Sequence, residues 1–181
     1  MKKLEILRSY ATEHAVDSLS TSDCKIWEAA RATSAAATFF DPIAIGQQEY
    51  VDGATGHNNP VESVLREADT IWKDARSRIQ CLMSIGTGVP DPQDFGDNLK
   101  EVVDTLKAIS TETEETERRF LRNSASFGIA DRYFRFNVSK GLSTIGLDEH
   151  DQKNRGRVIA ASEAYLEDQR VNEMIVKFIQ A

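Results

Sequence analysis

Between Tyr50 and Pro60 the sequence encodes a strand, a tight turn and the start of a helix, and this order limits the folds open to the chain. Asp52-Gly53 is typical of a turn that follows a buried strand. Asn59 can cap a helix in which Pro60 takes the first position. Because open α/β sheets carry their sites at the carboxyl ends of strands, the Asp52 carboxylate is the first candidate for chemistry.

Predicted strands and helices alternate along the whole chain. The expected strands span residues 4–7, 49–52, 79–85 and 133–138, and the expected helices about 25–37, 60–72, 96–122 and 158–179. Residues 79–85 are almost continuously apolar, as in a parallel strand that is buried on both faces. The acidic run 112–117 is expected to be a solvated helix face. Since no repeat or linker interrupts this order, we expect one continuous α/β unit.

Composition disfavours several classes of function. The 181 residues carry a formal net charge of -7, which argues against nucleic acid as a partner because phosphate binding needs clustered Lys and Arg. No apolar run approaches the roughly 20 residues that span a bilayer, and no apolar signal segment follows Met1-Lys2-Lys3. Cys24 and Cys81 form neither a disulfide framework nor a zinc site. We therefore expect a reduced, cytoplasmic chain with no metal and no cofactor.

Several motifs occur in series along the chain. An alanine-rich helix, Trp27–Ala36, precedes the segment Tyr50–Pro60, and the strand and turn Ser84–Gly88 come after it. The later stretch comprises Arg135–Leu142 and Leu147–Glu149. Together these segments resemble the patatin-like phospholipases, and the last stretch resembles the fungal members of that family.

The resemblance implies both a fold and a chemistry. The implied fold is the later part of a three-layer α/β fold, a mainly parallel sheet flanked by helices, in which residues 1–181 form the C-terminal portion of the domain and the N-terminal strands are missing. The implied chemistry is a Ser-Asp dyad that hydrolyses lipid or other acyl esters, in which the aspartate accepts the proton of the attacking serine. Asp52 matches the dyad aspartate, and Gly53 matches the glycine after it. The remaining motif positions are Ala54, Asn59 and Pro60. Peripheral contact with membranes stays open.

The nucleophile of that family is absent from this chain. Neither the glycine-rich loop of the oxyanion hole nor a Gly-x-Ser-x-Gly elbow occurs in the sequence. None of the serines considered has both glycines of an elbow: Ser34 has neither, Ser84 has only Gly86 after it, and Ser143 has only Gly141 before it. Because losing one oxyanion donor alone costs about 100- to 1,000-fold in rate, we expect the isolated chain to be inactive. We expect it to need its missing N-terminal segment as a partner, or to associate with itself at the exposed sheet edge.

Two other functions remain open at this point. The chain is alternatively a catalytically dead regulatory or interaction fragment. A weaker alternative is a small-molecule binding module that uses the Gly86–Gly88 turn. A lone Gly-x-Gly without a following lysine is a weak phosphate signature, so a tight turn after the strand is the simpler interpretation.

Structural roles are expected for several other side chains near the candidate site. Trp27, Phe39 and Phe40 are expected in the core, although aromatic residues beside an acyl pocket can serve both roles. Arg31 is expected to pair with an acidic neighbour such as Glu28, which lies on the same predicted helix.

Overall fold

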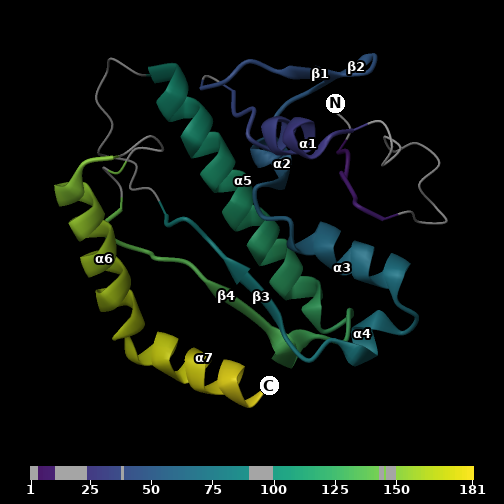
Figure 1. Cartoon of the computed structure of the whole chain (residues 1–181). Coiled ribbons are helices and arrows are strands. Elements are labelled where there is room, and N and C mark those ends of the chain that lie inside the picture. The colour runs from purple at the N-terminus through teal and green to yellow at the C-terminus, as the bar shows by residue number, and fades with distance from the viewer. Residues whose placement is uncertain (1–3, 11–23, 38, 90–99, 143–144, 146–149) are drawn as a thin grey trace. The chain divides into compact units, whose positions relative to one another are not determined.

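The computed structural model describes residues 4–10, 24–37, 39–89, 100–142, 145 and 150–181 (Figure 1). The chain divides into two compact units, residues 1–73 and 74–181. The sequence does not mark this boundary, because no proline or glycine lies within residues 61–85.

The first unit combines a β-hairpin with helices. Its elements are α1 (Ile26–Thr33), β1 (Ile43–Ile45), β2 (Gln48–Tyr50), α2 (Ala54–His57) and α3 (Val61–Ile71). β1 and β2 are antiparallel, with Ile43 opposite Tyr50. The strand expected at Leu4–Leu7 is wrong, because the chain forms no strand there. The expected buried strand is also wrong: β2 ends at Tyr50, and its residues are exposed or half-buried.

Helical spacing of apolar residues builds the core of the first unit. Val61, Leu65 and Ala68 lie on one face of α3, and all three are buried. The buried Ala32 of α1 and Ile45 of β1 belong to the same unit. The helix predicted after Pro60 from its apolar stripe is therefore confirmed as α3.

Glu28 caps α1 and does not pair with Arg31. The Glu28 Oε2 atom accepts a hydrogen bond from the backbone N–H of Lys25 at 2.7 Å, which satisfies one of the donors left open at the helix start. The helix ends at Thr33, short of the expected residue 37. The predicted ion pair is wrong because the capping contact holds the Glu28 carboxylate at the helix start.

The second unit contains a parallel pair of strands. Its elements are α4 (Ala75–Arg78), β3 (Leu82–Ile85), α5 (Lys100–Ser124), the 3-10 helix η2 (Ala130–Arg132), β4 (Tyr133–Phe136), α6 (Gln152–Leu166) and α7 (Gln169–Gln180). β3 and β4 pair in parallel, from Leu82 opposite Tyr133 to Ile85 opposite Phe136. Parallel strands joined through helices confirm the predicted α/β class.

Helices cover both faces of β4. Phe120 of α5 is fully buried and packs against Tyr133, with 4.7 Å between the ring centroids. Phe178 of α7 packs edge-on against Phe134 and Phe136, at 5.5 and 5.9 Å. Because successive side chains of a strand point to opposite faces, α5 and α7 lie on opposite faces of β4.

Two predicted elements of the second unit have different bounds. The strand expected over 79–85 spans only Leu82–Ile85, and it is not buried on both faces, because Met83 and Ile85 are exposed on one of them. The helix expected over 158–179 is two helices, α6 and α7. Asp168 separates them, since its carboxylate accepts a hydrogen bond from the backbone N–H of Arg170 at 2.9 Å and starts α7.

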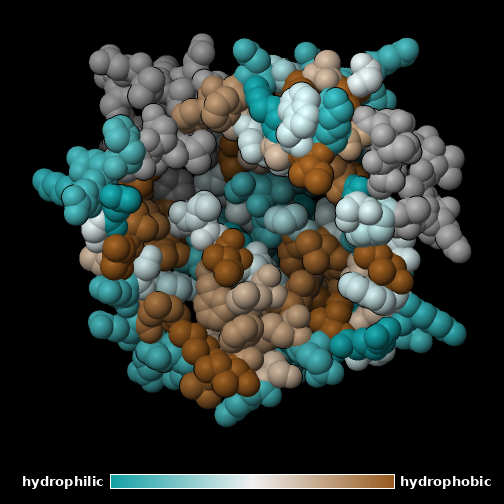
Figure 2. Space-filling view, viewed as in Figure 1, coloured by the Kyte–Doolittle hydropathy of each residue, from teal (hydrophilic) through white to brown (hydrophobic). Residues whose placement is uncertain are grey.

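Large apolar side chains reach the surface in both units (Figure 2). Trp27 and Phe40 are 59% and 58% exposed, so their placement in the core was wrong, and Phe39 is half-buried. In the second unit Met83 and Ile85 are 47% and 70% exposed. Hydropathy shows that a side chain can be buried, but not whether the fold supplies a surface to cover it.

Candidate functional site

Two hydrogen bonds fix Asp52, the candidate catalytic carboxylate. Its backbone N–H donates to the carbonyl of Ala35 at 3.0 Å, and its Oδ1 atom accepts from the backbone N–H of Ala54 at 2.8 Å. Within the described residues the second oxygen, Oδ2, accepts no hydrogen bond. The side chain is half-buried. One carboxylate oxygen is therefore held by the backbone while the other stays open to a partner.

The surroundings of Asp52 differ from the expected ones. It follows the antiparallel hairpin of β1 and β2, not a strand of the parallel sheet. Its position is set by the buried Ala35, which lies just after α1 and is 1% exposed. Asp52 remains a candidate on its motif, and the rule for open parallel sheets does not explain its placement.

Gly53 and Ala54 form the turn into α2. Gly53 has φ -66° and ψ -8°, which any residue adopts, and a Cβ atom built there meets nothing within 4 Å. Neither its backbone angles nor its surroundings therefore require a glycine at this position. The glycine that the backbone does require is Gly56, whose φ is +95°. Sequence reasoning missed Gly56, although it lies in the same motif.

Asn59 and Pro60 lie at the start of α3. Asn59 is 4% exposed, and its Oδ1 atom accepts a hydrogen bond from the backbone N–H of Val61 at 3.3 Å. Pro60 occupies the position just before the first helical residue, whereas we expected it to be that residue. The cap position itself is taken by Pro60, which makes no side-chain cap hydrogen bond. Asn59 therefore lies one position before the cap that we predicted for it, and its side chain contacts the N–H of the first helical residue.

Both glycine N–H groups of the Gly86–Gly88 turn, and the N–H of Val89 after it, already have acceptors. Gly86 N donates to the carbonyl of Phe136 at 2.8 Å, and Val89 N donates to that of Val138 at 2.9 Å. Gly88 N donates to Asn137 Oδ1 at 2.8 Å. These donors face β4 and the residues after it, so the turn is a structural one, and the structure argues against a small-molecule site built on it.

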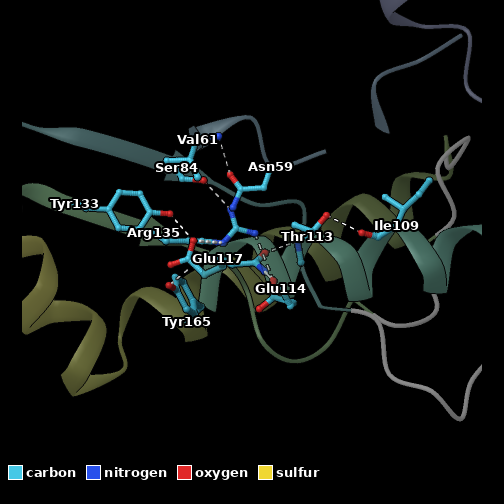
Figure 3. Close-up of polar contacts among 12 residues, drawn as sticks. Asn59, Val61, Ser84, Ile109, Thr113, Glu114, Glu117, Tyr133, Arg135 and Tyr165 are labelled. Carbon is cyan, nitrogen blue, oxygen red and sulfur yellow. Dashed lines mark hydrogen bonds and ion pairs between the residues drawn. The ribbon is translucent and has the colours of Figure 1, made fainter. Parts of the chain in front are cut away.

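A partly buried polar cluster lies between α5 and the two parallel strands (Figure 3). Arg135 donates from Nη1 to Ser84 Oγ at 2.8 Å, and its guanidinium forms ion pairs with Glu114 at 3.4 Å and Glu117 at 3.6 Å. The hydroxyl of Tyr133 donates to Glu117 Oε2. The expected solvated face is thus wrong for this part of α5, since Arg135 neutralises the carboxylates that the helix presents.

Burial and pairing set the ionisation of this cluster. Desolvation, together with the hydrogen bond to Glu117, raises the pKa of the Tyr133 hydroxyl well above its usual range. The phenol therefore remains a donor at neutral pH. Ser84 accepts a hydrogen bond from Arg135, a cation that cannot take up a proton, so this contact does not activate Ser84 as a nucleophile. Ser143 lies outside the described residues.

Two kinds of feature do not occur in the part of the chain that the structure describes. Within it, no three His, Cys, Asp or Glu side chains gather in a way that would hold a metal ion. None of the helices described is both long enough and apolar enough to cross a bilayer.

Comparison with known proteins agrees with the motif series. Residues 6–65 match the family described as patatin-like phospholipase, a range that contains Asp52 and Asn59. The chain is 30% identical over 172 residues to rat calcium-independent phospholipase A2-gamma, covering 91% of this chain and 21% of the relative. These matches support a lipid hydrolase family.

Other similar proteins are also named as phospholipases. The chain is 32% identical over 149 residues to phospholipase A I of Arabidopsis thaliana, covering 80% of this chain and 11% of the relative. It is 29% identical over 181 residues to the mouse calcium-independent phospholipase A2-gamma. The chain thus spans about a fifth or less of the length of these relatives. No solved structure matches significantly.

Proposed function

We propose that this chain is the later part of a lipid acyl hydrolase domain and that it supplies the base of a Ser-Asp dyad. Asp52 is that base, Gly53 is the motif glycine that follows it, and the backbone N–H of Ala54 holds its Oδ1 atom. The proposed substrates are carboxylic esters of lipids, in line with the phospholipase names of the relatives. The nucleophilic serine belongs to a segment outside these 181 residues.

The observation that carries the proposal is the arrangement of the Asp52 carboxylate. A dyad aspartate must receive a proton at one oxygen while its orientation is fixed through the other. Here the Ala54 N–H fixes Oδ1 at 2.8 Å, and within the described residues Oδ2 accepts no hydrogen bond. The hydrogen bond from Asp52 N to the Ala35 carbonyl holds the backbone that carries the carboxylate. This matters because a small misplacement of a catalytic group costs a large factor in rate.

The proposed reaction balances without a cofactor. The serine oxygen attacks the ester carbonyl as its proton passes to Asp52 Oδ2, and collapse of the tetrahedral intermediate expels the alcohol, which takes up that proton. Water then attacks the acyl-serine with Asp52 again accepting a proton, which restores both groups and releases the fatty acid. The oxyanion donors and the serine are both supplied by the segment outside this chain.

The test restores the missing part. The region that precedes the aligned segment in rat calcium-independent phospholipase A2-gamma is fused to this chain, and the fusion is reacted with a fluorophosphonate and with a 4-nitrophenyl acyl ester. Asp52→Asn should abolish both reactions, whereas Glu49→Gln, which removes an exposed carboxylate from β2 of the same hairpin, should leave both unchanged. An active fusion that tolerates Asp52→Asn would remove Asp52 from the chemistry.

A second candidate function is a catalytically dead interaction fragment, favoured by the absence of a Gly-x-Ser-x-Gly elbow from the chain. The same fusion separates the two. If a folded fusion, shown by a cooperative unfolding transition, labels with fluorophosphonate only in the presence of Asp52, the chain contributes chemistry. If it stays unlabelled, the interaction fragment is the better account.

A further inference from the structure

Arg31 is a half-buried cation without a carboxylate partner in the described part of the chain. Its Nη2 atom donates to the backbone carbonyl of Asp41 at 2.6 Å, and the ring of Phe40 stacks on its guanidinium at 5.4 Å. Glu28, the nearest candidate acid in sequence, is held by Lys25 instead. Within the described residues Arg31 therefore carries a full positive charge that no side chain neutralises.

The hydrogen-bonding capacity of Arg31 is also largely unused. A guanidinium offers five N–H donors in a fixed fork. Among the described residues only the Asp41 carbonyl accepts from it, and Nη1 is buried with no acceptor. Buried donors and charges normally have partners, since leaving them unpaired costs free energy. A bound anion would supply both the missing charge and the missing acceptors.

A cavity of about 300 Å³ lies at this guanidinium. It is lined by Arg31, Phe39, Phe40 and Asp41. Phe40 is 58% exposed, so its ring can turn aside and give an anion access to the guanidinium that it covers. The Asp41 side chain is exposed and carries the one negative charge of the lining, which disfavours a doubly charged phosphate and leaves a singly charged phosphodiester as the better fit.

The same helix end that forms the cavity also anchors the proposed base. The backbone N–H groups of Phe39 and Phe40 donate to the carbonyl of Ala36 at 3.1 and 2.9 Å, and Asp52 N donates to the neighbouring Ala35 carbonyl. Arg31 lies about one helical turn before Ala35. A group bound at Arg31 would therefore be held in the same small unit as Asp52, with a short backbone path between them.

We propose that the cavity at Arg31 binds the singly charged phosphodiester of a phospholipid headgroup. Its guanidinium would bind the phosphate oxygens through a charge-assisted fork, as arginine does at other phosphate sites. The lipid source of the phosphodiester rests on the proposed function, while the anion site itself rests on Arg31 and the cavity. The site would make the chain select phospholipids over neutral acyl esters.

The test measures binding by the full 181-residue chain, without any need for hydrolysis. Dihexanoyl phosphatidylcholine, kept below its critical micelle concentration, is titrated into the protein in a calorimeter. Dihexanoylglycerol, with the same acyl chains and no phosphate, and inorganic phosphate are the comparison ligands. The expected result is saturable binding of the phospholipid at least about tenfold tighter than of either comparison ligand, since a charge-assisted fork contributes more than one unit of log affinity.

Three variants decide whether Arg31 is responsible. Arg31→Gln should weaken phospholipid binding by about tenfold or more, and Arg66→Gln, which removes an exposed charge from α3 of the same unit, should not change it. Asp41→Asn alters only an exposed side chain and should strengthen binding about two- to fivefold, because it removes a like charge from the cavity mouth. This second effect tests the site even if Arg31→Gln fails to fold.

Several results would overturn the proposal. They are equal binding of the phospholipid and dihexanoylglycerol, equal binding of inorganic phosphate, loss of affinity in Arg66→Gln, or unchanged affinity in Asp41→Asn. None of these results bears on Asp52, because the fusion test of the dyad uses an ester without phosphate. Failure of the phosphodiester site and failure of the proposed hydrolase are therefore distinguishable.

Discussion

Replacing Gly86 by alanine should destabilise the second unit strongly, because the turn after β3 is clamped to the residue that follows β4. A Cβ atom at Gly86 would collide with the Oδ1 atom of Asn137 and would lie 2.9 Å from Nη2 of Arg135. The Asn137 side chain cannot move away without weakening its own hydrogen bonds. Its Oδ1 atom accepts from Gly88 N at 2.8 Å, and its Nδ2 atom donates to Glu114 Oε1 at 3.0 Å.

The magnitude follows from these two contacts. A neutral hydrogen bond contributes about 0.5–1.5 kcal/mol and one to a charged group about 1.5–3 kcal/mol. Displacing the Asn137 side chain weakens both, so we expect Gly86→Ala to lower the free energy of unfolding by about 2–4 kcal/mol. Gly156→Ala is the matched control in the same unit. Its Cβ atom meets nothing within 4 Å in the interior of α6, so it should stabilise by about 0.5–1 kcal/mol.

The assay is urea unfolding followed by far-UV circular dichroism. Fluorescence would be misleading, since the two tryptophans, Trp27 and Trp72, both lie in the first unit. The reasoning is refuted if Gly86→Ala changes the free energy of unfolding by less than about 0.5 kcal/mol, or if Gly156→Ala destabilises as much as Gly86→Ala does. Either result would mean that the turn adapts and that the clamp is not rigid.

Three further predictions concern other contacts. Asp168→Ala should cost about 1 kcal/mol in urea unfolding, because the cap that starts α7 is lost, and an unchanged midpoint would contradict the capping role. The hydrogen bond from Arg8 lowers the pKa of Glu67 below its usual 4.5, so the stability that this contact contributes is present above pH 4.5 and is lost as the pH falls through the lowered pKa. Glu67→Gln should weaken the dependence of the free energy of unfolding on acid pH, and an unchanged dependence would refute the assignment. The exposed Met83 and Ile85 of β3 should make the chain self-associate, which a monodisperse monomer in light scattering at tens of micromolar would contradict.

Periodicity was enough to predict most of the regular structure. The apolar stripe of α3 and the alternation of β4 are strong local signals, and their elements form where the pattern placed them. β1 was missed because it is a strand of three residues, Ile43–Ile45, too short to show alternation. The break between α6 and α7 was missed because Asp168 interrupts a continuous helical pattern with a cap, not with glycine or proline.

The candidate site was predictable only as far as local chemistry reaches. The motif named Asp52 as the candidate base, and the contacts that the Asp52 and Asn59 side chains make with backbone N–H groups two residues later are local in sequence. The anchor at Ala35 depends on how α1 meets the hairpin, which no local pattern encodes. The same holds for Arg135 and Glu117, which lie far apart in sequence, so a run of acidic residues on α5 looked like a solvated face although part of it is buried.

The most direct measurement is the intact mass of the isolated chain after exposure to a fluorophosphonate, with Asp52→Asn as the control. The proposed function predicts no adduct on either protein, because the chain holds a base and no activated serine. A stoichiometric adduct that disappears in Asp52→Asn would show that one of the serines within these 181 residues is the nucleophile. That result would contradict the conclusion that the serine lies outside this chain.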